Sequence, residues 1–195
     1  MAIKLFPSDL PSRQFLEFAA EGYNSPVSGV IHTKDFPARN GMPLGSVGTG
    51  CIDLETDGAL GYCTIFNSHV PRRGPINLPF MGLCLHNDGQ MHESWVLSAT
   101  PLRPNPMPGP FTTSFRPKRA CPAEDIHYWG HYPVADLEFE LDCPVSVGLR
   151  TWAPFIPGDT VASNTPGAVF EVHLRNASEA PQTGMIFFSF PGPSP

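Results

Sequence analysis

This 195-residue chain has few basic residues and no long apolar run. Lys and Arg number 12 against 18 Asp and Glu, for a formal net charge of −6, and the longest basic run is Arg72-Arg73. Nucleic-acid binding needs a clustered basic face, so that function class is excluded. No stretch approaches the ~20 apolar residues of a membrane-spanning helix, so we expect no membrane span. The first residues have no apolar segment ahead of their prolines, so we expect no secretory signal.

The chain also lacks paired cysteines. Its five cysteines are odd in number, and none shows Cys-x-x-Cys spacing. This pattern predicts free thiols and a location in the reducing cytoplasm. The Asn176-Ala177-Ser178 sequon is then interpreted as a polar turn, because glycosylation requires secretion. The cysteines are Cys51, Cys63, Cys84, Cys121 and Cys143.

Proline and glycine are abundant, at 24 and 18 residues, and leave little room for long helices. Only residues 13–21 show helical spacing, with Ser12 as a cap and Gly22 at the end, so we expect one short N-terminal helix. A 41% share of hydrophobic residues suffices for one sizeable core. We therefore expect a 1–40 extension followed by a β-sandwich over 41–195.

Turn chemistry predicts short strands at hairpin spacing. Thr56-Asp57-Gly58 separates strands at 51–55 and 59–66, and Asn87-Asp88-Gly89 separates strands at 81–86 and 90–97. A long loop with seven prolines spans 101–122. Further strands are expected at 134–142 and 145–152, and then as a final pair at 168–175 and 183–190. About eight strands without a βαβ rhythm predict an all-β, antiparallel sandwich.

An acidic row at 136–142 suggests a glycosidase, because these enzymes use two carboxylates. Asp136, Glu138, Glu140 and Asp142 alternate with apolar residues, which is typical of a strand with one wet face. Catalytic carboxyls flank a substrate from two sides, whereas these project side by side. We therefore interpret the row as a solvated face.

Three other motifs invite a chemical interpretation. Residues 45–50 have GxxGxG spacing before a strand, so we expect glycines with positive φ and close packing, not a nucleotide loop. Cys84, His86 and His92 lie on one predicted hairpin without an evident fourth ligand, so we expect no metal. No Gly-x-Ser-x-Gly elbow is present, and no cofactor is expected.

Aromatic residues offer the one candidate for ligand contact. Residues 127–132 form an aromatic cluster whose burial is favoured, although stacked rings also hold sugars. The candidates for carbohydrate contact are Trp95, Trp129 and Trp152. They would serve a free-standing carbohydrate-binding module, and a sandwich without any ligand is a third interpretation.

Several short motifs occur in a characteristic order along the chain. Residues 43–52 are similar to a Pro-Leu-Gly-Gly-Ile-Gly segment, and 128–135 are similar to Gly-x-Tyr-Pro-x-Ala. The other matching segments are 58–67, 80–85, 155–159, 163–166, 169–171 and Asn176. Together they resemble the N-terminal domain of glycoside hydrolase family 116, which includes the bile-acid β-glucosidase (non-lysosomal glucosylceramidase). Ser46 replaces a usual glycine and 64–66 replace a tryptophan-bearing strand, so we expect a divergent member.

This resemblance implies a two-domain retaining enzyme whose Glu nucleophile and Asp acid/base lie in a C-terminal (α/α)6 barrel. The chain would be a truncated, incomplete supersandwich-type domain without a catalytic residue, inactive alone and supporting the barrel, its partner. Loop 101–122 would reach toward that barrel, and β-glucosides are the expected ligands. The alternative remains the free-standing carbohydrate-binding sandwich.

Overall fold

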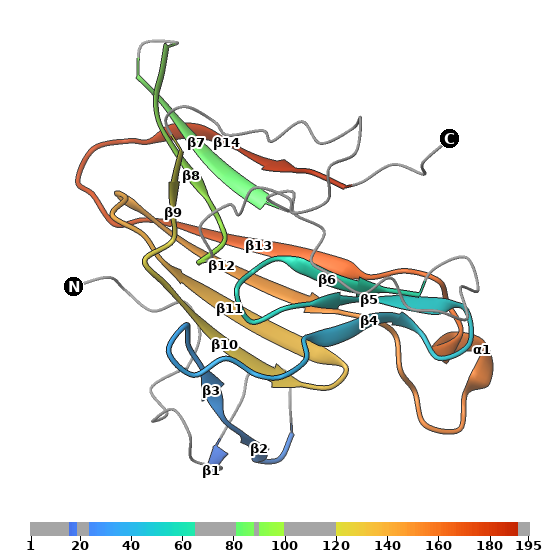
Figure 1. Ribbon diagram of the computed structural model, residues 1–195. Helices are drawn as coiled ribbons and strands as arrows, with labels where there is room; N and C mark the ends of the chain where they lie inside the picture. Colours follow the sequence, from blue (N-terminus) through green and yellow to red (C-terminus); the bar gives the residue numbers. More distant parts are fainter. Residues whose placement is uncertain (1–15, 19–23, 65–80, 88–89, 100–119, 191–195) are drawn as a thin grey trace, which may run out of the picture.

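The computed structural model describes residues 16–18, 24–64, 81–87, 90–99 and 120–190 (Figure 1). These residues form mostly strands. The largest sheet has the order β13 (Val169–Asn176), β12 (Val145–Trp152), β11 (Val134–Glu140), β10 (Asp125–His131) and β3 (Ile31–His32). A second sheet has the order β14 (Thr183–Phe188), β7 (Met81–Asn87), β8 (Gln90–Val96) and β9 (Ala120–Pro122). Apart from the parallel pair β8–β9, the described pairs are antiparallel.

Two smaller sheets complete the described fold. β4 (Met42–Ser46), β5 (Gly50–Leu54) and β6 (Leu60–Cys63) form a meander, and β1 (Leu16–Phe18) pairs with β2 (Val27–Gly29). The one helix among the described residues is the short α1 (Thr160–Ser163). None of the described helices is long and apolar enough to cross a membrane. The predicted all-β, sandwich-like fold is confirmed.

The core lies between the inner faces of the two large sheets and the meander. Because side chains alternate along a strand, β10, β11 and β12 each send every second residue inward. Ile126, Leu137, Val147 and Leu149 are at most 1% exposed. They pack in one cluster with Leu83 and Trp95 of the second sheet and with Leu44 and Leu54 of the meander.

The predicted Asp-Gly hairpins are confirmed in the described residues. Between β5 and β6, Glu55 N donates to Ala59 O at 2.8 Å, and Gly58 has φ +79°. β7 pairs with β8 as expected, although their turn at 88–89 lies outside the described residues. Gly45 and Gly50 have φ of +143° and +104°, so the predicted role of the glycines at 45–50 is confirmed as well.

The predicted N-terminal helix is wrong where the structure describes it. Of residues 13–21, only Leu16–Phe18 are described, and they form β1, with Glu17 opposite Ser28 of β2. Backbone pairing with a neighbouring strand has overridden the local helical spacing. The predicted loop 101–122 lies mostly outside the described residues, and its end forms β9.

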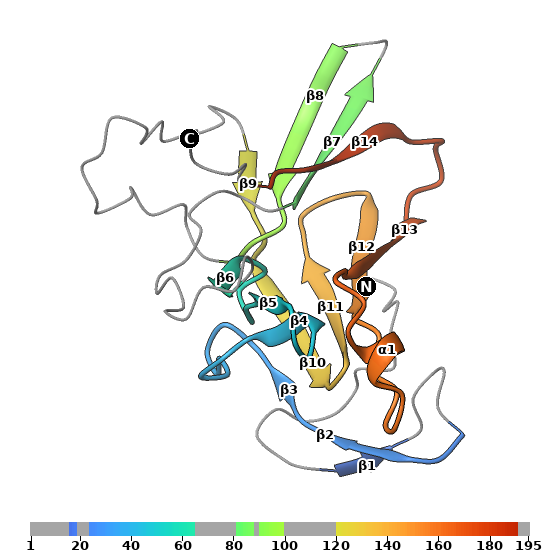
Figure 2. The ribbon, with the colours of Figure 1, turned by 90° about the vertical axis from the view of Figure 1, so that its right-hand side faces the viewer.

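The predicted final strand pair is also wrong, although both strands exist. β13 pairs with β12, and β14 pairs with β7 of the other sheet. Residues 177–182 therefore cross between the sheets. The crossing begins with the predicted polar turn, in which Ser178 N donates to Asn176 Oδ1 at 2.9 Å and Asn176 Nδ2 donates to Ala180 O at 2.7 Å. Figure 2 shows both strands on one side of the molecule.

Candidate functional site

The three candidate tryptophans lie in three different surroundings. Trp95 is buried in the core on β8, and Trp129 is buried on the opposite, outer face of β10. Trp152 is the exposed one, at 37%, at the end of β12. Trp129 and Trp152 share the outer face of the large sheet, with β11 between their strands. The structure therefore leaves Trp152 as the one of the three that offers a ring to a ligand.

The acidic row is not uniformly solvated, which corrects the expectation for Asp136. Asp136 is 2% exposed and accepts two hydrogen bonds from Arg150, at 2.7 Å to Oδ1 from Nε and at 3.0 Å to Oδ2 from a terminal nitrogen. His131 Nε2 lies 3.5 Å from Oδ2. Glu140 and Asp142 are exposed, as expected. The row thus contains one buried ion-paired carboxylate.

Packing on the outer face explains this burial. Trp129 is opposite Asp136 in the register of β10 and β11, and its ring centroid lies 3.7 Å from that of His131. β2 covers the indole so closely that a Cβ on Gly29 would lie 2.9 Å from Trp129 Cδ1. Trp129 and β2 therefore exclude water from the outer face around Asp136, although strand alternation alone predicts that this face is exposed to solvent.

Electrostatics fix the charge state of Asp136. Burial by itself would raise the pKa of this carboxyl. Hydrogen bonds from His131 and Arg150, together with the charges of both partners, outweigh burial and lower the pKa below its ordinary value of 3.8. A carboxylate held as an anion by the Arg150 guanidinium suits a structural ion pair and not a general acid, which needs a raised pKa.

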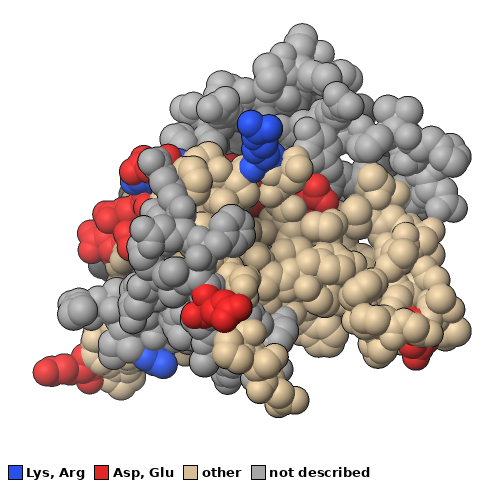
Figure 3. Space-filling view, turned by 90° about the horizontal axis from the view of Figure 1, so that it is seen from below, with Lys and Arg blue, Asp and Glu red and all other residues tan. Residues whose placement is uncertain are grey.

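An exposed apolar surface, which we call the aromatic end, lies where β12 ends. It consists of Tyr132, Trp152, Phe155 and Ile156, each at least 37% exposed. The rings of Tyr132 and Phe155 meet edge to face at 5.2 Å, and Ala153 N donates to Pro133 O at 3.3 Å, which ties the two segments together. In the view from below, most of the acidic side chains lie toward the left, and a largely uncharged surface lies at the centre and right of the described part (Figure 3).

Local hydrogen bonds hold the loop of the aromatic end in shape. Asp159 caps α1, with its Oδ1 accepting from Val161 N at 3.0 Å and Ala162 N at 2.9 Å. The buried Ser163 hydroxyl accepts from Ile156 N at 2.9 Å, and Val47 N donates to Ser163 O at 3.1 Å. The exposed rings therefore stand on an ordered support.

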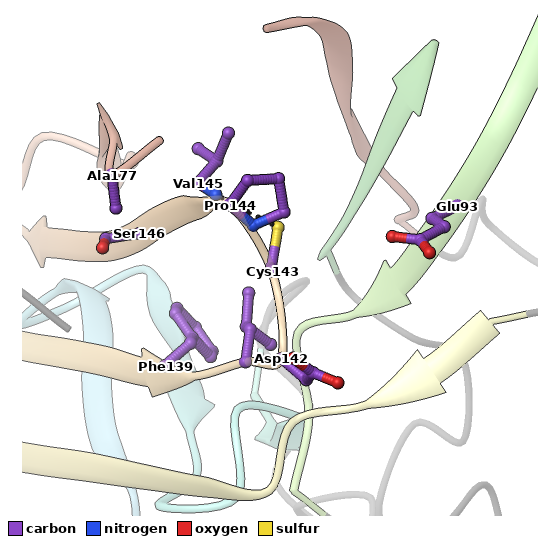
Figure 4. A pocket seen from close by; sticks show the side chains of 9 residues that line it. Glu93, Phe139, Asp142, Cys143, Pro144, Val145, Ser146 and Ala177 are labelled. Atoms are coloured by element: carbon purple, nitrogen blue, oxygen red, sulfur yellow. Dashed lines mark hydrogen bonds between the residues drawn. The ribbon is translucent and has the colours of Figure 1, made fainter. Parts of the chain in front are cut away.

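A cavity of about 520 Å³ opens between β8 and the turn that joins β11 to β12 (Figure 4). Phe139, Leu141 and Val145 provide its apolar surface, and the carboxylates Glu93 and Asp142 come from opposite sides. Burial raises the pKa of the Cys143 thiol, and the negative charges of both carboxylates add to this shift. A thiol with a raised pKa is a poor nucleophile. Both carboxylates are exposed, unlike the buried acid of a glycosidase.

One further cluster was missed by the sequence analysis. Asp125, His127 and Glu140 place their ligand atoms within 4.8 Å of one another, on β10 and at the end of β11. His127 Nε2 already lies 2.8 Å from Glu140 Oε1, and Asp125 Oδ1 accepts from Lys34 N at 2.8 Å. Only strand pairing, which puts Asp125 opposite Glu140, reveals this group.

The structure also places two of the residues considered above as metal ligands on the β7–β8 hairpin. In the register of the two strands, Cys84 lies opposite Ser94 and His86 lies opposite Met91, and the register shifts between Leu85 and His86.

The fold and these sites define a β-sandwich domain whose described surface offers an aromatic end and a cavity with two carboxylates. Residues 41–193 match the family described as beta-glucosidase 2, glycosyl-hydrolase family 116 N-term. This match covers well over half of the chain, so the chain belongs to that family. A search of curated proteins found no match.

Proposed function

We propose that this chain is a non-catalytic N-terminal domain of a β-glucosidase or glucosylceramidase-like enzyme, and that it supports a separate (α/α)6 catalytic barrel. The observation that carries the proposal is the family match over 41–193, whose description names the N-terminal part of the enzyme. The barrel itself, and its two catalytic carboxylates, are what the family resemblance implies. Four free thiols among the described cysteines support a cytoplasmic enzyme.

The surroundings of the described carboxylates support the absence of catalysis. Asp136 is held by Arg150, and Glu140 contacts His127 at 2.8 Å. Glu93 and Asp142 do border a cavity, but they lie at its exposed rim. A retaining glycosidase needs two carboxyls about 5–5.5 Å apart across the scissile bond, one of them with a raised pKa.

Hydrolysis of an aryl β-glucoside by the purified chain tests the proposal. We expect the chain to release the aryl alcohol no faster than a heat-killed sample does. A signal above that control, which disappears in the double variant Glu93→Gln, Asp142→Asn, would instead make the cavity an active site. The variant Glu171→Gln, which changes an exposed carboxylate away from the cavity, is the matched control.

A second candidate function is carbohydrate binding at the aromatic end. It is favoured by the exposure of Trp152 together with the Tyr132–Phe155 ring pair, since sugars stack on exposed rings. Calorimetric titration with methyl β-glucoside should then give a saturable signal that Trp152→Ala removes. Phe188→Ala, which truncates another exposed ring, on β14 (50% exposed against 37% for Trp152), serves as the control. No saturable signal would eliminate this candidate.

A further inference from the structure

Strand register brings the imidazole of His127 together with two carboxylates at one end of the large sheet. Asp125 and His127 are two positions apart on β10, so their side chains lie on the same outer face, and Asp125 is opposite Glu140 of β11. One ligand atom of each side chain lies within 4.8 Å of the other two. Among the described residues, this is the one group of three such side chains. The register therefore gathers one nitrogen and two oxygen ligands at a single place.

The distances suit a divalent ion of the zinc class. Zinc binds imidazole nitrogen and carboxylate oxygen at about 2.0–2.2 Å, which places tetrahedral ligand atoms about 3.4 Å apart. The observed separations lie on both sides of that value, since His127 Nε2 is 2.8 Å from Glu140 Oε1 and the three atoms span at most 4.8 Å. The side chains of His127 and Glu140 are 21% and 53% exposed, so they have room to adjust and water has access as a fourth ligand.

The charges of this group call for a cation. Two carboxylates lie beside one imidazole, and among the described residues neither Asp125 nor Glu140 has an ion pair with lysine or arginine. Lys34 contacts the group, but through its backbone N, which donates to Asp125 Oδ1 at 2.8 Å. Its ammonium donates instead to the Glu124 carbonyl oxygen at 2.5 Å. The group therefore carries more negative than positive charge.

A second cluster on the same face of the sheet shows what completes such a group. Asp136 also lies beside a histidine, His131, at 3.5 Å. There the Arg150 guanidinium supplies the positive charge, with Nε 2.7 Å from Asp136 Oδ1. The group of Asp125, His127 and Glu140 has one carboxylate more and no arginine, so a divalent cation matches its charge.

We propose that Asp125, His127 and Glu140 bind a divalent transition-metal ion of the zinc class. One imidazole among the ligands favours such an ion over Mg²⁺ and Ca²⁺, which take oxygen ligands. The role of the ion is structural. It joins β10 to β11 where their pairing ends, and through Asp125 it also holds Lys34, which follows β3. The inference does not depend on the proposed function, because its three ligands all belong to this chain.

Titration of the 195-residue chain with Co²⁺ tests the inference, because Co²⁺ substitutes for Zn²⁺ and absorbs visible light when protein groups bind it. We expect one equivalent to bind, without the charge-transfer band that a cysteine ligand produces, and Zn²⁺ to displace it. The absence of saturable binding up to about 1 mM would overturn the inference. A sulfur-to-cobalt band would overturn it as well, since the ion would then bind the free cysteines.

Variants of the ligands locate the ion. Glu140→Gln and Asp125→Asn should each weaken Co²⁺ binding at least about tenfold. Asp125→Asn keeps the Oδ1 that accepts from Lys34 N, so the local backbone contact is retained. Glu171→Gln is the matched control, because Glu171 makes another 2.8 Å contact with a histidine, His173, outside any such group of three. Equal affinities in the parent chain and in Glu140→Gln would contradict the inference.

Thermal melts test the structural role of the ion separately. Free Zn²⁺ at about 100 times its dissociation constant should raise the melting midpoint of the parent chain by about 5 °C or more, because the ion binds the folded state. The midpoint of Glu140→Gln should rise much less at the same concentration. An unchanged midpoint in the parent chain, or equal rises in the two proteins, would refute a structural ion at this site.

Discussion

Arg150 holds Asp136 in a two-point ion pair across neighbouring strands. The two hydrogen bonds measure 2.7 and 3.0 Å, and the carboxylate is 2% exposed. The pair joins β11 to β12 on the outer face of the large sheet, where the indole of Trp129 and β2 exclude water. The stability of that face therefore depends on this ion pair. Removal of either side chain would leave the charge of the other without its partner in a largely buried position.

Asp136→Asn should destabilise the chain strongly. The amide cannot neutralise Arg150, and breaking a buried pair from one side costs about 3–5 kcal/mol. Urea unfolding gives the free energy directly. Glu171→Gln is the matched control, because it alters an exposed pair with His173 and should cost less than about 1 kcal/mol. Equal losses in the two variants would show that the Asp136 pair contributes no more than a surface contact.

The same pair predicts how stability depends on acid. The pKa of Asp136 is lowered in the folded chain, so its contribution is present above the unfolded value of about 3.9 and is lost as the pH falls through the folded pKa. The difference in urea midpoint between the parent chain and Asp136→Asn should therefore narrow below about pH 4. A difference that stays constant from neutral pH to about pH 3 would contradict the assignment.

The pKa of Tyr128 is shifted upward, so its contribution to stability is expected to be lost at alkaline pH and not in acid. Its hydroxyl donates to Leu54 O at 3.3 Å, and burial raises its pKa far above the ordinary value of 10.0. A raised tyrosine pKa favours the neutral form in the folded state, so this stability is present below about pH 10 and is lost as the pH rises further. Ultraviolet titration should show one tyrosine that ionises only on unfolding, and Tyr128→Phe should remove that step. Ionisation of every tyrosine near pH 10 in the folded chain would be inconsistent with this burial.

Alanine substitutions at three glycines distinguish the cost of backbone strain from the cost of steric overlap. Gly58→Ala combines a φ of +79° with a Cβ that would lie 2.6 Å from Leu97 O, and should cost at least about 1–3 kcal/mol. Gly158→Ala has φ +87° and open space around it, so it should cost less. Gly167→Ala has neither constraint, and we expect a change within about 0.5 kcal/mol. Thermal melts rank the three, and a different order would refute this explanation of the β5–β6 turn.

Local chemistry explains what the sequence could predict. The Asp57-Gly58 step and the glycines at 45–50 specify turns through backbone conformation, which depends on the residues themselves. Alternation along 145–152 likewise specifies a strand with one buried face, as found. These features need no knowledge of what lies across the sheet.

The predictions that were wrong depend on which strands pair and on which residues pack against them. β13 and β14 are both good strands, but nothing in their sequences says that they pair with β12 and β7 instead of with each other. Alternation places Asp136 on the outer face without revealing that Trp129 and β2 cover it. The cluster of Asp125, His127 and Glu140 depends in the same way on the register of two strands.

The central claim, that catalysis lies outside this chain, is tested most directly by trapping the glycosyl-enzyme intermediate. Retaining glycosidases form a covalent intermediate on a carboxylate, which an activated 2-deoxy-2-fluoroglucoside traps for peptide mass mapping. We predict that the complete enzyme is labelled at a carboxylate outside residues 1–195 and that the isolated chain is not labelled. A glycosyl adduct on Glu93, Asp142 or any other carboxylate of this chain would contradict the claim.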